Sequence, residues 1–170
     1  MSLVESLGYR HRPPNGLHRA VQAVAATGPG SWAFSKASPP LDRWAFRASD
    51  GRWTLASALA GLPVVMLATT GARSGLERET PLVGIPHEED LAIIGSGYGQ
   101  RATPAWVHNL RARPIAKLTY RSVVADVLAT EVADPASVWE RARATFPGYA
   151  AYPRRAAHRA IAVFVLRPVP

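Results

Sequence analysis

The chain has 170 residues, of which 48% are apolar and 19% charged, and it contains no cysteine. This length and composition predict one globular domain with a single core and exclude a disordered chain. The lack of cysteine excludes disulfides, thiolate metal sites and cysteine nucleophiles. A net charge of +8, from 20 basic and 12 acidic residues, favours an anionic partner: nucleic acid, an anionic membrane or a polyanionic small molecule.

The first sixty residues are expected to form a helix followed by an extension rich in aromatic residues and proline. Helical spacing predicts an amphipathic helix with an inner face made of Leu17, Ala20, Val21 and Val24. Gly28-Pro29-Gly30 is expected to end this helix. Residues 31–50 hold four aromatic side chains among prolines and are expected to be ordered but irregular, with a short helix over 41–46.

Residues 53–72 are uncharged and long enough to span a bilayer. Polar residues, glycine and proline interrupt this segment, so a loop followed by a buried strand is the better interpretation. The first twelve residues lack the apolar core of a signal peptide. We therefore expect a cytoplasmic protein, with peripheral membrane contact left open, that is either a monomer or a homodimer.

From residue 61 onward the pattern becomes β-rich, and residues 61–170 are predicted to be the main unit of one compact domain. The expected strands are 62–70, 79–86, 91–96, 115–120, 123–132 and 160–166. Two helices are expected in this part of the chain. Thr103 is expected to be the N-cap of the first, with Pro104 at its first helical position, and Asp134-Pro135 is expected to start the second in the same way. Short antiparallel strands joined by hairpins predict an α+β fold that closes as a small barrel or half-barrel.

The turn between the first two predicted strands carries Arg73, Ser74 and Arg78 between flexible glycines. Two guanidinium groups, a hydroxyl group and exposed backbone N–H groups at one hairpin suit a phosphate or carboxylate. A solvated hairpin with ordinary surface arginines is the alternative interpretation.

Three other segments combine polar groups with unusual backbone: the glycine-rich loop from Ser96 to Gln100, the helix start after Thr103, and residues 146–155. Trp106 and Asn109 are three residues apart on that helix, so both can reach one ligand. Core packing for Trp106 and a helix-end hydrogen bond for Asn109 are the alternatives. No histidine spacing typical of a metal site, no Rossmann fingerprint, no P-loop and no nucleophile elbow is present, so no metal is expected. The candidate segments contain few pairs of titratable side chains that could act as acid and base, but many groups that can contact an anion. This favours a protein that holds a cofactor and lets the cofactor react.

Three motifs in order resemble the deazaflavin-dependent nitroreductase family, whose members are split-β-barrel oxidoreductases that use coenzyme F-420, an 8-hydroxy-5-deazaflavin. The motifs are Thr69–Gly75 with Arg78 and Pro81, Pro104–Leu110 with Pro114, and Phe146–Tyr152. The resemblance covers about residues 62–168.

This resemblance implies a split β-barrel close to the FMN-binding fold, and hydride transfer from the reduced deazaflavin to a quinone, nitro compound or activated alkene. It implies coenzyme contacts from the turn and from residues near the ring: Arg73, Ser74, Arg78, Pro81, Ser96, Gly97, Trp106 and Asn109. It further implies that Ser96, Tyr149 and Tyr152 wall the reactive pocket and act in catalysis.

The sequence departs from the family pattern at the glycine-rich loop. The family's Ser-Lys-Gly-Gly is here Ser96-Gly97-Tyr98-Gly99, which removes a cation. Val83 and Phe146 replace an aromatic residue and a tyrosine of the nitroimidazole-activating member, which puts that activity in doubt more than coenzyme binding. An FMN-dependent enzyme on the same barrel, a deazaflavin carrier without turnover, and a nucleic-acid-binding protein remain as alternatives.

Overall fold

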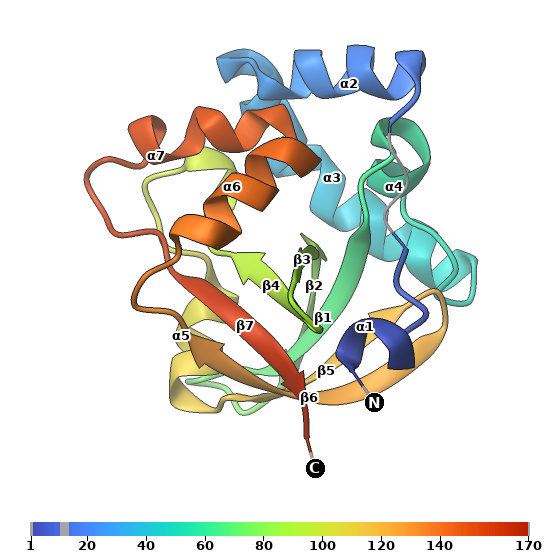
Figure 1. Ribbon diagram of the computed structural model, residues 1–170, viewed down its shortest axis with the longest axis vertical. Helices are drawn as coiled ribbons and strands as arrows, with labels where there is room; N and C mark the ends of the chain where they lie inside the picture. The colour runs from blue at the N-terminus through green and yellow to red at the C-terminus, as the bar shows by residue number, and fades with distance from the viewer. Residues whose placement is uncertain (1, 11–13, 170) are drawn as a thin grey trace.

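The computed structural model describes residues 2–10 and 14–169, and Figure 1 shows a curled β-sheet with most of its helices gathered over one end. The α-helices are α1 Leu3–Ser6, α2 Gly16–Ala26, α3 Gly28–Ala48, α4 Leu55–Ala60, α5 Ala105–Ala112, α6 Ala136–Thr145 and α7 Tyr152–Arg155. Two 3₁₀ helices cover Gly97–Gly99 and Pro147–Ala150. The strands are β1 Val64–Thr70, β2 Glu77–Val83, β3 Ile85–His87, β4 Asp90–Ile94, β5 Ile115–Tyr120, β6 Val123–Glu131 and β7 Val163–Pro168.

The seven described strands form one antiparallel sheet in the order β2-β1-β5-β6-β7-β4-β3. Only Gly84 separates β2, at one edge, from β3, at the other, so the chain steps directly between the two edges of the curled sheet. β2 also contacts β4, which brings the two ends of the sheet together. The predicted α+β split barrel with flanking helices is therefore confirmed.

The hairpins form where turn chemistry predicts them. β1 and β2 pair from Val64 opposite Val83 to Thr70 opposite Glu77, which leaves residues 71–76 as the turn. Arg121 and Ser122 make the two-residue turn between β5 and β6, both with positive φ, the geometry that suits a twisted hairpin. Glu88 and Glu89 form the polar turn between β3 and β4.

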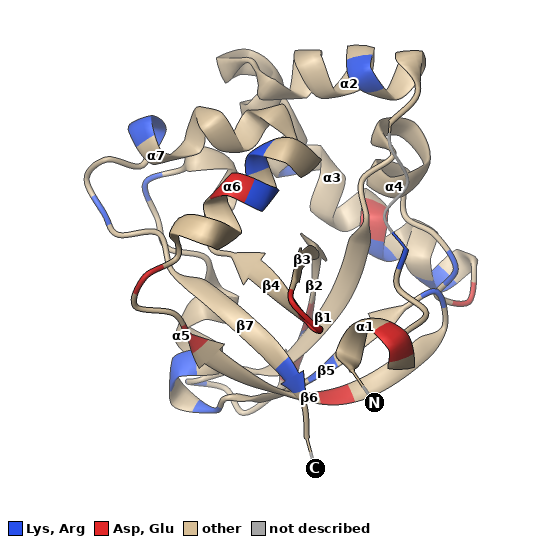
Figure 2. Ribbon diagram, viewed as in Figure 1, with Lys and Arg blue, Asp and Glu red and all other residues tan. Residues whose placement is uncertain are grey.

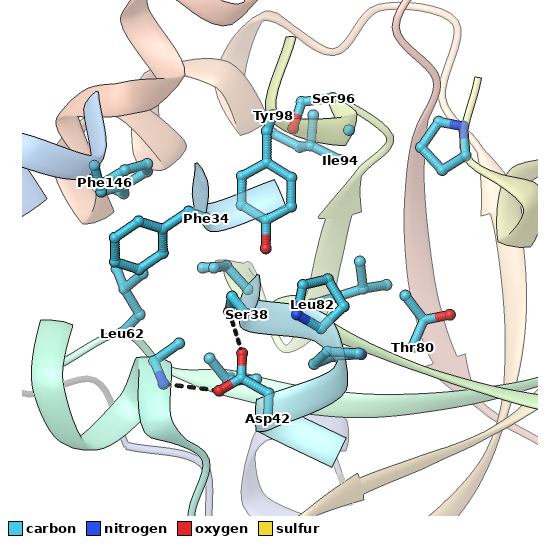
Figure 3. A pocket seen from close by; sticks show the side chains of 18 of the residues that line it. Phe34, Ser38, Asp42, Leu62, Thr80, Leu82, Ile94, Ser96, Tyr98 and Phe146 are labelled. Carbon is cyan, nitrogen blue, oxygen red and sulfur yellow. Dashed lines mark hydrogen bonds between the residues drawn. The ribbon is translucent and has the colours of Figure 1, made fainter. Parts of the chain in front are cut away.

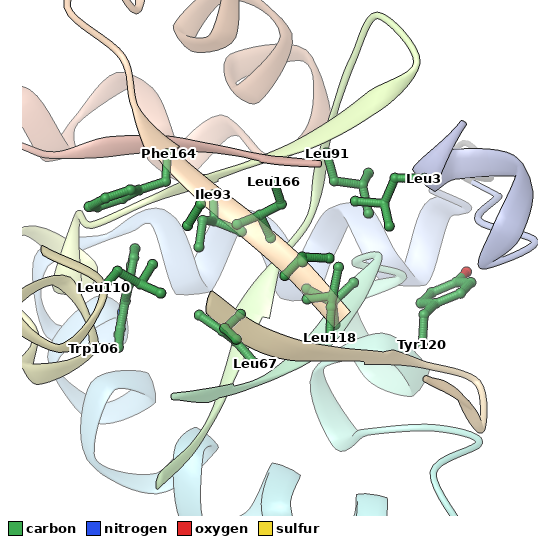
Figure 4. Packing of buried hydrophobic residues seen from close by; sticks show 14 of the residues in the cluster. Leu3, Leu67, Leu91, Ile93, Trp106, Leu110, Leu118, Tyr120, Phe164 and Leu166 are labelled. Atoms are coloured by element: carbon green, nitrogen blue, oxygen red, sulfur yellow. The ribbon is translucent and has the colours of Figure 1, made fainter. Parts of the chain in front are cut away.

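Two apolar layers share the strands because side chains alternate between the faces of a sheet. Leu91, Ile93, Phe164 and Leu166 point into the barrel, where they meet α1 and α5 (Figure 4). The alternate residues of β4 and β7 belong to a second cluster, which packs beneath α6 and the 147–155 segment. This second layer holds the helical end of the molecule against the barrel.

The prediction of an irregular segment over residues 31–50 with a short helix over 41–46 is wrong. Thr27 accepts a hydrogen bond from the backbone N–H of Gly30 and caps the N-terminus of α3, and Pro29 occupies its first turn. The helix then continues to Ala48 through Pro39 and Pro40. Two internal prolines normally argue against a helix, but tertiary packing of its buried face outweighs that cost here.

The predicted inner face of α2 is also wrong, although the helix itself is present. Leu17 and Val24 are 68% and 62% exposed, whereas Gln22 and Ala25 are buried. The amide of Gln22 donates to the carbonyl of Ala60 at the end of α4. A polar contact to another helix, which periodicity does not reveal, therefore sets the orientation of α2.

Smaller differences concern helix starts. Residues 55–60, expected as a loop, form α4, because Thr54 and Ser57 make a reciprocal capping box. Thr103 is not the N-cap of α5; Pro104 holds that position and no side chain caps the helix.

Candidate active site

A cavity of about 280 Å³ lies between the helical end of the molecule and the edge of the barrel (Figure 3). Its lining is mainly apolar, with a few hydroxyl groups and one carboxyl group. The helices contribute Ala25, Phe34, Ser38, Pro39, Asp42, Ala56, Ala60, Pro104, Ala105 and Trp106. The strands, loops and C-terminal segment contribute Leu62, Val64, Thr80, Pro81, Leu82, Val83, Ile94, Ser96, Gly97, Tyr98, Phe146, Tyr149 and Tyr152. Apolar walls with few polar groups are typical of a small-molecule site.

Residues of all three predicted site motifs meet at this cavity. The predicted site residues that line it are Pro81, Ser96, Gly97, Trp106, Tyr149 and Tyr152. Arg73, Ser74, Arg78 and Asn109 lie outside the lining, on or beneath the adjoining β1–β2 turn. The structure therefore places the predicted ring contacts and the predicted anion contacts in two neighbouring regions.

The β1–β2 turn is well ordered by its own hydrogen bonds. The N–H of Gly71 donates to the carbonyl of Leu76 at 2.8 Å, and the N–H of Leu76 donates to the Ser74 hydroxyl at 3.3 Å. Arg73 and Arg78 are exposed, and Arg78 is two residues from Thr80, on the same face of β2. A strand advances about 3.3 Å per residue, so Arg78 begins roughly 7 Å from the cavity lining.

The charge balance of this region favours an anion. Within the described ranges 2–10 and 14–169, the ion pairs are Arg47–Glu79, Arg111–Glu131 and Arg167–Asp90. The first of these neutralises Glu79, the acidic residue that follows Arg78 on β2. Arg73 and Arg78 take part in none of the three, and neither does the exposed Glu77 that precedes Arg78, so two arginines face one glutamate at this turn.

Asn109 connects the turn to α5. Its side-chain oxygen accepts from the N–H of Ala72 at 2.9 Å, and its amide donates to the Thr69 hydroxyl at 3.0 Å. The side chain is 7% exposed. Asn109 thus positions the turn that carries the arginines. Trp106, one helical turn earlier, packs against Phe164 in the core and also lines the cavity. The two interpretations of Trp106, core packing and contact with a ligand, are therefore compatible.

The glycine-rich loop is held by an arginine that sequence reasoning did not single out. The Arg159 guanidinium donates to the carbonyls of Gly95, Ser96 and Gln100 at 3.1, 2.8 and 3.2 Å. Partial burial lowers the pKa of Arg159. These contacts fix the backbone on both sides of Ser96, whose side chain is buried at the cavity wall.

Replacing Arg159 with alanine is expected to lower the free energy of unfolding by roughly 2 kcal/mol, because three partly buried backbone carbonyls lose a charged hydrogen-bond donor. We also expect at least a tenfold loss of turnover as the loop that carries Ser96 loosens, measured by urea denaturation and steady-state kinetics. Arg154→Ala is the matched control, since Arg154 is exposed in the same segment. Equal behaviour of the two variants would contradict a positioning role for Arg159.

Tyr149 and Tyr152 pack edge to face at 5.5 Å between ring centroids, next to Phe146. Burial raises the pKa of Tyr149, with a smaller contribution from Tyr152. Burial also raises the pKa of Tyr152 to about 12, while a hydrogen bond with Ser31 acts in the opposite direction. Both phenols therefore remain protonated at neutral pH and can donate hydrogen bonds.

This shift predicts how stability depends on pH. The pKa of Tyr152 rises on folding from 10.0 to about 12, so its contribution to stability is present below pH 10.0 and is lost as the pH rises toward about 12. We expect the urea midpoint to fall across that interval, and to fall less in Tyr152→Phe. A midpoint with the same pH dependence in both proteins would show that another group is responsible.

Among the polar lining residues, sequence reasoning missed Ser38, Asp42, Thr80 and Tyr98. Asp42 is a carboxyl group only 2% exposed, and the helix that carries it was predicted to be largely irregular. A usable signal was present in the sequence. Ser31 and Ser38 are seven residues apart and Ser38 and Asp42 are four apart, the spacings that place polar residues on one face of a helix.

Comparison with known proteins identifies the family. The model of the F420H(2)-dependent quinone reductase family matches residues 41–168. The chain belongs to this family. The prediction of a deazaflavin-dependent oxidoreductase that uses coenzyme F-420 is thereby confirmed, and the match begins about twenty residues before the segment in which the sequence showed the resemblance. The match therefore includes the second half of α3, with Asp42.

Two solved structures have folds similar to that of this chain. An F420-H2 dependent reductase (FDR-A) is 31% identical, with a TM-score of 0.56, over 61% of this chain and 93% of that chain. A structure described as a domain-swapped dimer is 27% identical, with a TM-score of 0.58, over 82% of this chain and 99% of that chain.

No helix in ranges 2–10 and 14–169 is long and apolar enough to cross a membrane. The same ranges hold no group of three or more potential metal ligands.

Proposed function

We propose that this F-420-dependent reductase transfers a hydride to a small quinone bound in the 280 Å³ cavity, with the coenzyme tail held by the β1–β2 turn. The observation that carries the proposal is the adjacency of an apolar, hydroxyl-bearing cavity and an arginine turn, joined through α5. The coenzyme has the same two-part character: a flat ring at one end and a phosphodiester with an oligoglutamate tail at the other.

The residues present fit such a ligand. Trp106, Pro81 and the strand residues around it offer a flat apolar wall for a ring. Arg73 and Arg78 offer guanidinium groups to phosphate and carboxylate oxygens, with Ser74 beside them. Gly97 has a φ of +53°, and a side chain there would come within 3.3 Å of Pro104, so glycine keeps this part of the cavity rim open.

The bound coenzyme supplies a hydride, and the protein must supply orientation and polar contacts. Ser96, whose backbone carbonyl Arg159 holds, is the residue whose hydroxyl would donate to an oxygen on which negative charge develops. Tyr149 and Tyr152 remain neutral and extend this wall. One well-placed donor contributes about 3 kcal/mol to the stabilisation of such an oxyanion. The aromatic side chains around the cavity would keep water out, and water would weaken the hydrogen bonds to this oxygen if it entered.

The direct test is turnover. Reduced coenzyme F-420 and menadione are mixed with purified protein, and the return of oxidised deazaflavin absorbance is followed. Saturable oxidation that depends on the protein is expected, with at least a tenfold lower rate in Ser96→Ala. Coenzyme oxidation that no quinone accelerates would refute the proposed acceptor class.

The alternatives have distinct outcomes. A yellow protein with ordinary flavin absorbance, active with reduced FMN, would identify an FMN enzyme. Tight coenzyme binding without oxidation by any acceptor would identify a carrier. Figure 2 shows Lys and Arg dispersed over several helices and strands, and salt-sensitive retention on DNA would be needed to revive the nucleic-acid alternative. Light scattering decides between the predicted monomer and homodimer.

A further inference from the structure

A second cavity, of about 330 Å³, lies beside the first and has a different chemical character. Leu62 and Val64 line both cavities, so the two adjoin at the start of β1. Among the described lining residues, the first cavity has one carboxyl group and no basic side chain, whereas the second has four basic side chains and no acidic one. The four come from separate segments: Arg10, His18 on α2, Arg52 ahead of α4 and Arg121 in the β5–β6 turn.

Within the described ranges 2–10 and 14–169, ion pairs do not neutralise the arginines of this second cavity. Arg10, Arg52 and Arg121 belong to none of the three ion pairs found there. Asp50 is close to Arg52 in the sequence, but it is exposed and outside the cavity lining. Guanidinium groups gathered around one cavity repel one another. An anion with several oxygens relieves this repulsion and accepts paired hydrogen bonds from them.

The β5–β6 turn is held at this cavity by the loop between α3 and α4, and Figure 1 shows the two side by side. The N–H of Ser122 donates to the carbonyl of Gly51 at 3.0 Å, and the Ser122 hydroxyl donates to the carbonyl of the residue before it. The guanidinium carbon of Arg121 lies 5.4 Å from the ring centroid of Tyr120, which also lines the cavity. Arg52 and Arg121, far apart in the sequence, are therefore brought to one cavity by fixed contacts.

Aromatic side chains accompany the basic groups. Phe46 and Trp53 line the cavity, and Trp53 is 44% exposed. The backbone of Trp53 is held in place, because its N–H donates to the Ser49 hydroxyl at 3.2 Å. His18 lies against the backbone at Gly61, where a Cβ atom would come within 2.4 Å of the imidazole Nδ1. An exposed indole beside guanidinium and imidazole groups suits a ligand that has both a flat ring and anionic oxygens.

We propose that this second cavity binds a small organic phosphate, with two or more phosphate groups on the arginines and a flat ring against Trp53. A nucleoside diphosphate has this chemistry. The turn that carries Arg73 and Arg78 follows Thr70, at the other end of β1, and the seven residues of that strand span about 20 Å. The cavity is therefore a ligand site separate from the arginine turn. The inference does not depend on the proposed quinone acceptor.

Calorimetric titration of the protein with ADP and with inorganic pyrophosphate tests the proposal. We expect ADP to bind at one site with a Kd of about 100 μM or lower, and pyrophosphate to bind about fivefold more weakly because it has no ring. Arg52→Ala and Arg121→Ala should each weaken ADP binding about tenfold. Trp53→Ala should reduce the affinity for ADP to that for pyrophosphate. Arg143→Ala removes an exposed arginine of α6 and is the matched control, which should bind ADP like wild type.

Titration of the same variants with coenzyme F-420 separates this cavity from the coenzyme site. Arg52→Ala and Arg121→Ala should keep the coenzyme affinity of wild type, and loss of both turn arginines should leave ADP binding unchanged. Thermal unfolding of each variant within a few degrees of wild type confirms that the cavity, rather than the fold, has been altered. If Arg121→Ala does not fold, Arg10→Ala replaces it.

Three results would overturn the proposal. The first is an absence of ADP binding at millimolar concentration, and the second is an ADP affinity that neither arginine substitution in the cavity lowers. The third is competition between ADP and the coenzyme that the Arg52→Ala and Arg121→Ala substitutions abolish, because the coenzyme tail would then occupy this cavity. Equal affinities of the wild type for ADP and pyrophosphate would exclude the contact between the ring and Trp53.

Discussion

Replacing Asn109 with alanine is expected to lower the free energy of unfolding by roughly 1–3 kcal/mol and to weaken coenzyme binding at least tenfold. The buried Thr69 hydroxyl loses the donor of one hydrogen bond, although it still donates to the carbonyl of Arg78, and the N–H of the exposed Ala72 loses its protein acceptor. The coenzyme effect follows because the turn that carries Arg73 and Arg78 loses its attachment to α5.

Urea denaturation and coenzyme titration measure the two effects of Asn109→Ala. His108→Ala is the control, because His108 is the exposed neighbour on the same helix, and its unfolding free energy should stay within about 0.5 kcal/mol of wild type. If Asn109→Ala destabilises the protein while coenzyme affinity is retained, the turn is not part of the coenzyme site.

Removal of both turn arginines is expected to produce the largest loss of coenzyme affinity. Each of Arg73→Ala and Arg78→Ala should weaken binding about tenfold, and the double variant about a hundredfold, because each loses a charge-assisted contact to an anionic oxygen. Both side chains are exposed, so stability should change little.

Salt dependence separates this electrostatic role from a structural one. Raising the ionic strength should weaken wild-type binding steeply and the double variant only slightly, since exposed charges are screened. Arg143→Ala, another exposed arginine on α6, should behave like wild type. Equal salt dependence of the wild type and the double variant would show that the tail binds elsewhere.

Local chemistry made the barrel predictable from the sequence. Gly71 and Gly75, the Glu88-Glu89 turn and the Arg121-Ser122 pair mark hairpins by residue type, and short apolar runs mark the strands between them. The helical end was less predictable because its structure is set by tertiary contacts. Pro39 and Pro40 argue locally against α3. The orientation of α2, which exposes Leu17 and Val24, is set by tertiary contacts such as the bond from Gln22 to Ala60 and the packing of Ala25 in the second apolar cluster.

The candidate site divides in the same way. Ser96, Trp106, Tyr149 and Tyr152 could be placed at one cavity because their motifs resemble a family whose fold joins them. Arg159 could not, because the carbonyls that it contacts lie 59 to 64 residues earlier in the chain. Asp42 was missed because the helix that carries it was predicted to be largely irregular. The sequence already showed that the loop departs from the family motif at Tyr98, and the structure adds that Tyr98 lines the cavity.

The central claim is that the cavity and the arginine turn together hold coenzyme F-420, and equilibrium titration tests it most directly. Deazaflavin fluorescence is recorded as wild-type protein is added to the coenzyme at low ionic strength. The account predicts saturable quenching in the micromolar range that added salt reverses. Unchanged fluorescence at protein concentrations well above that range would contradict it.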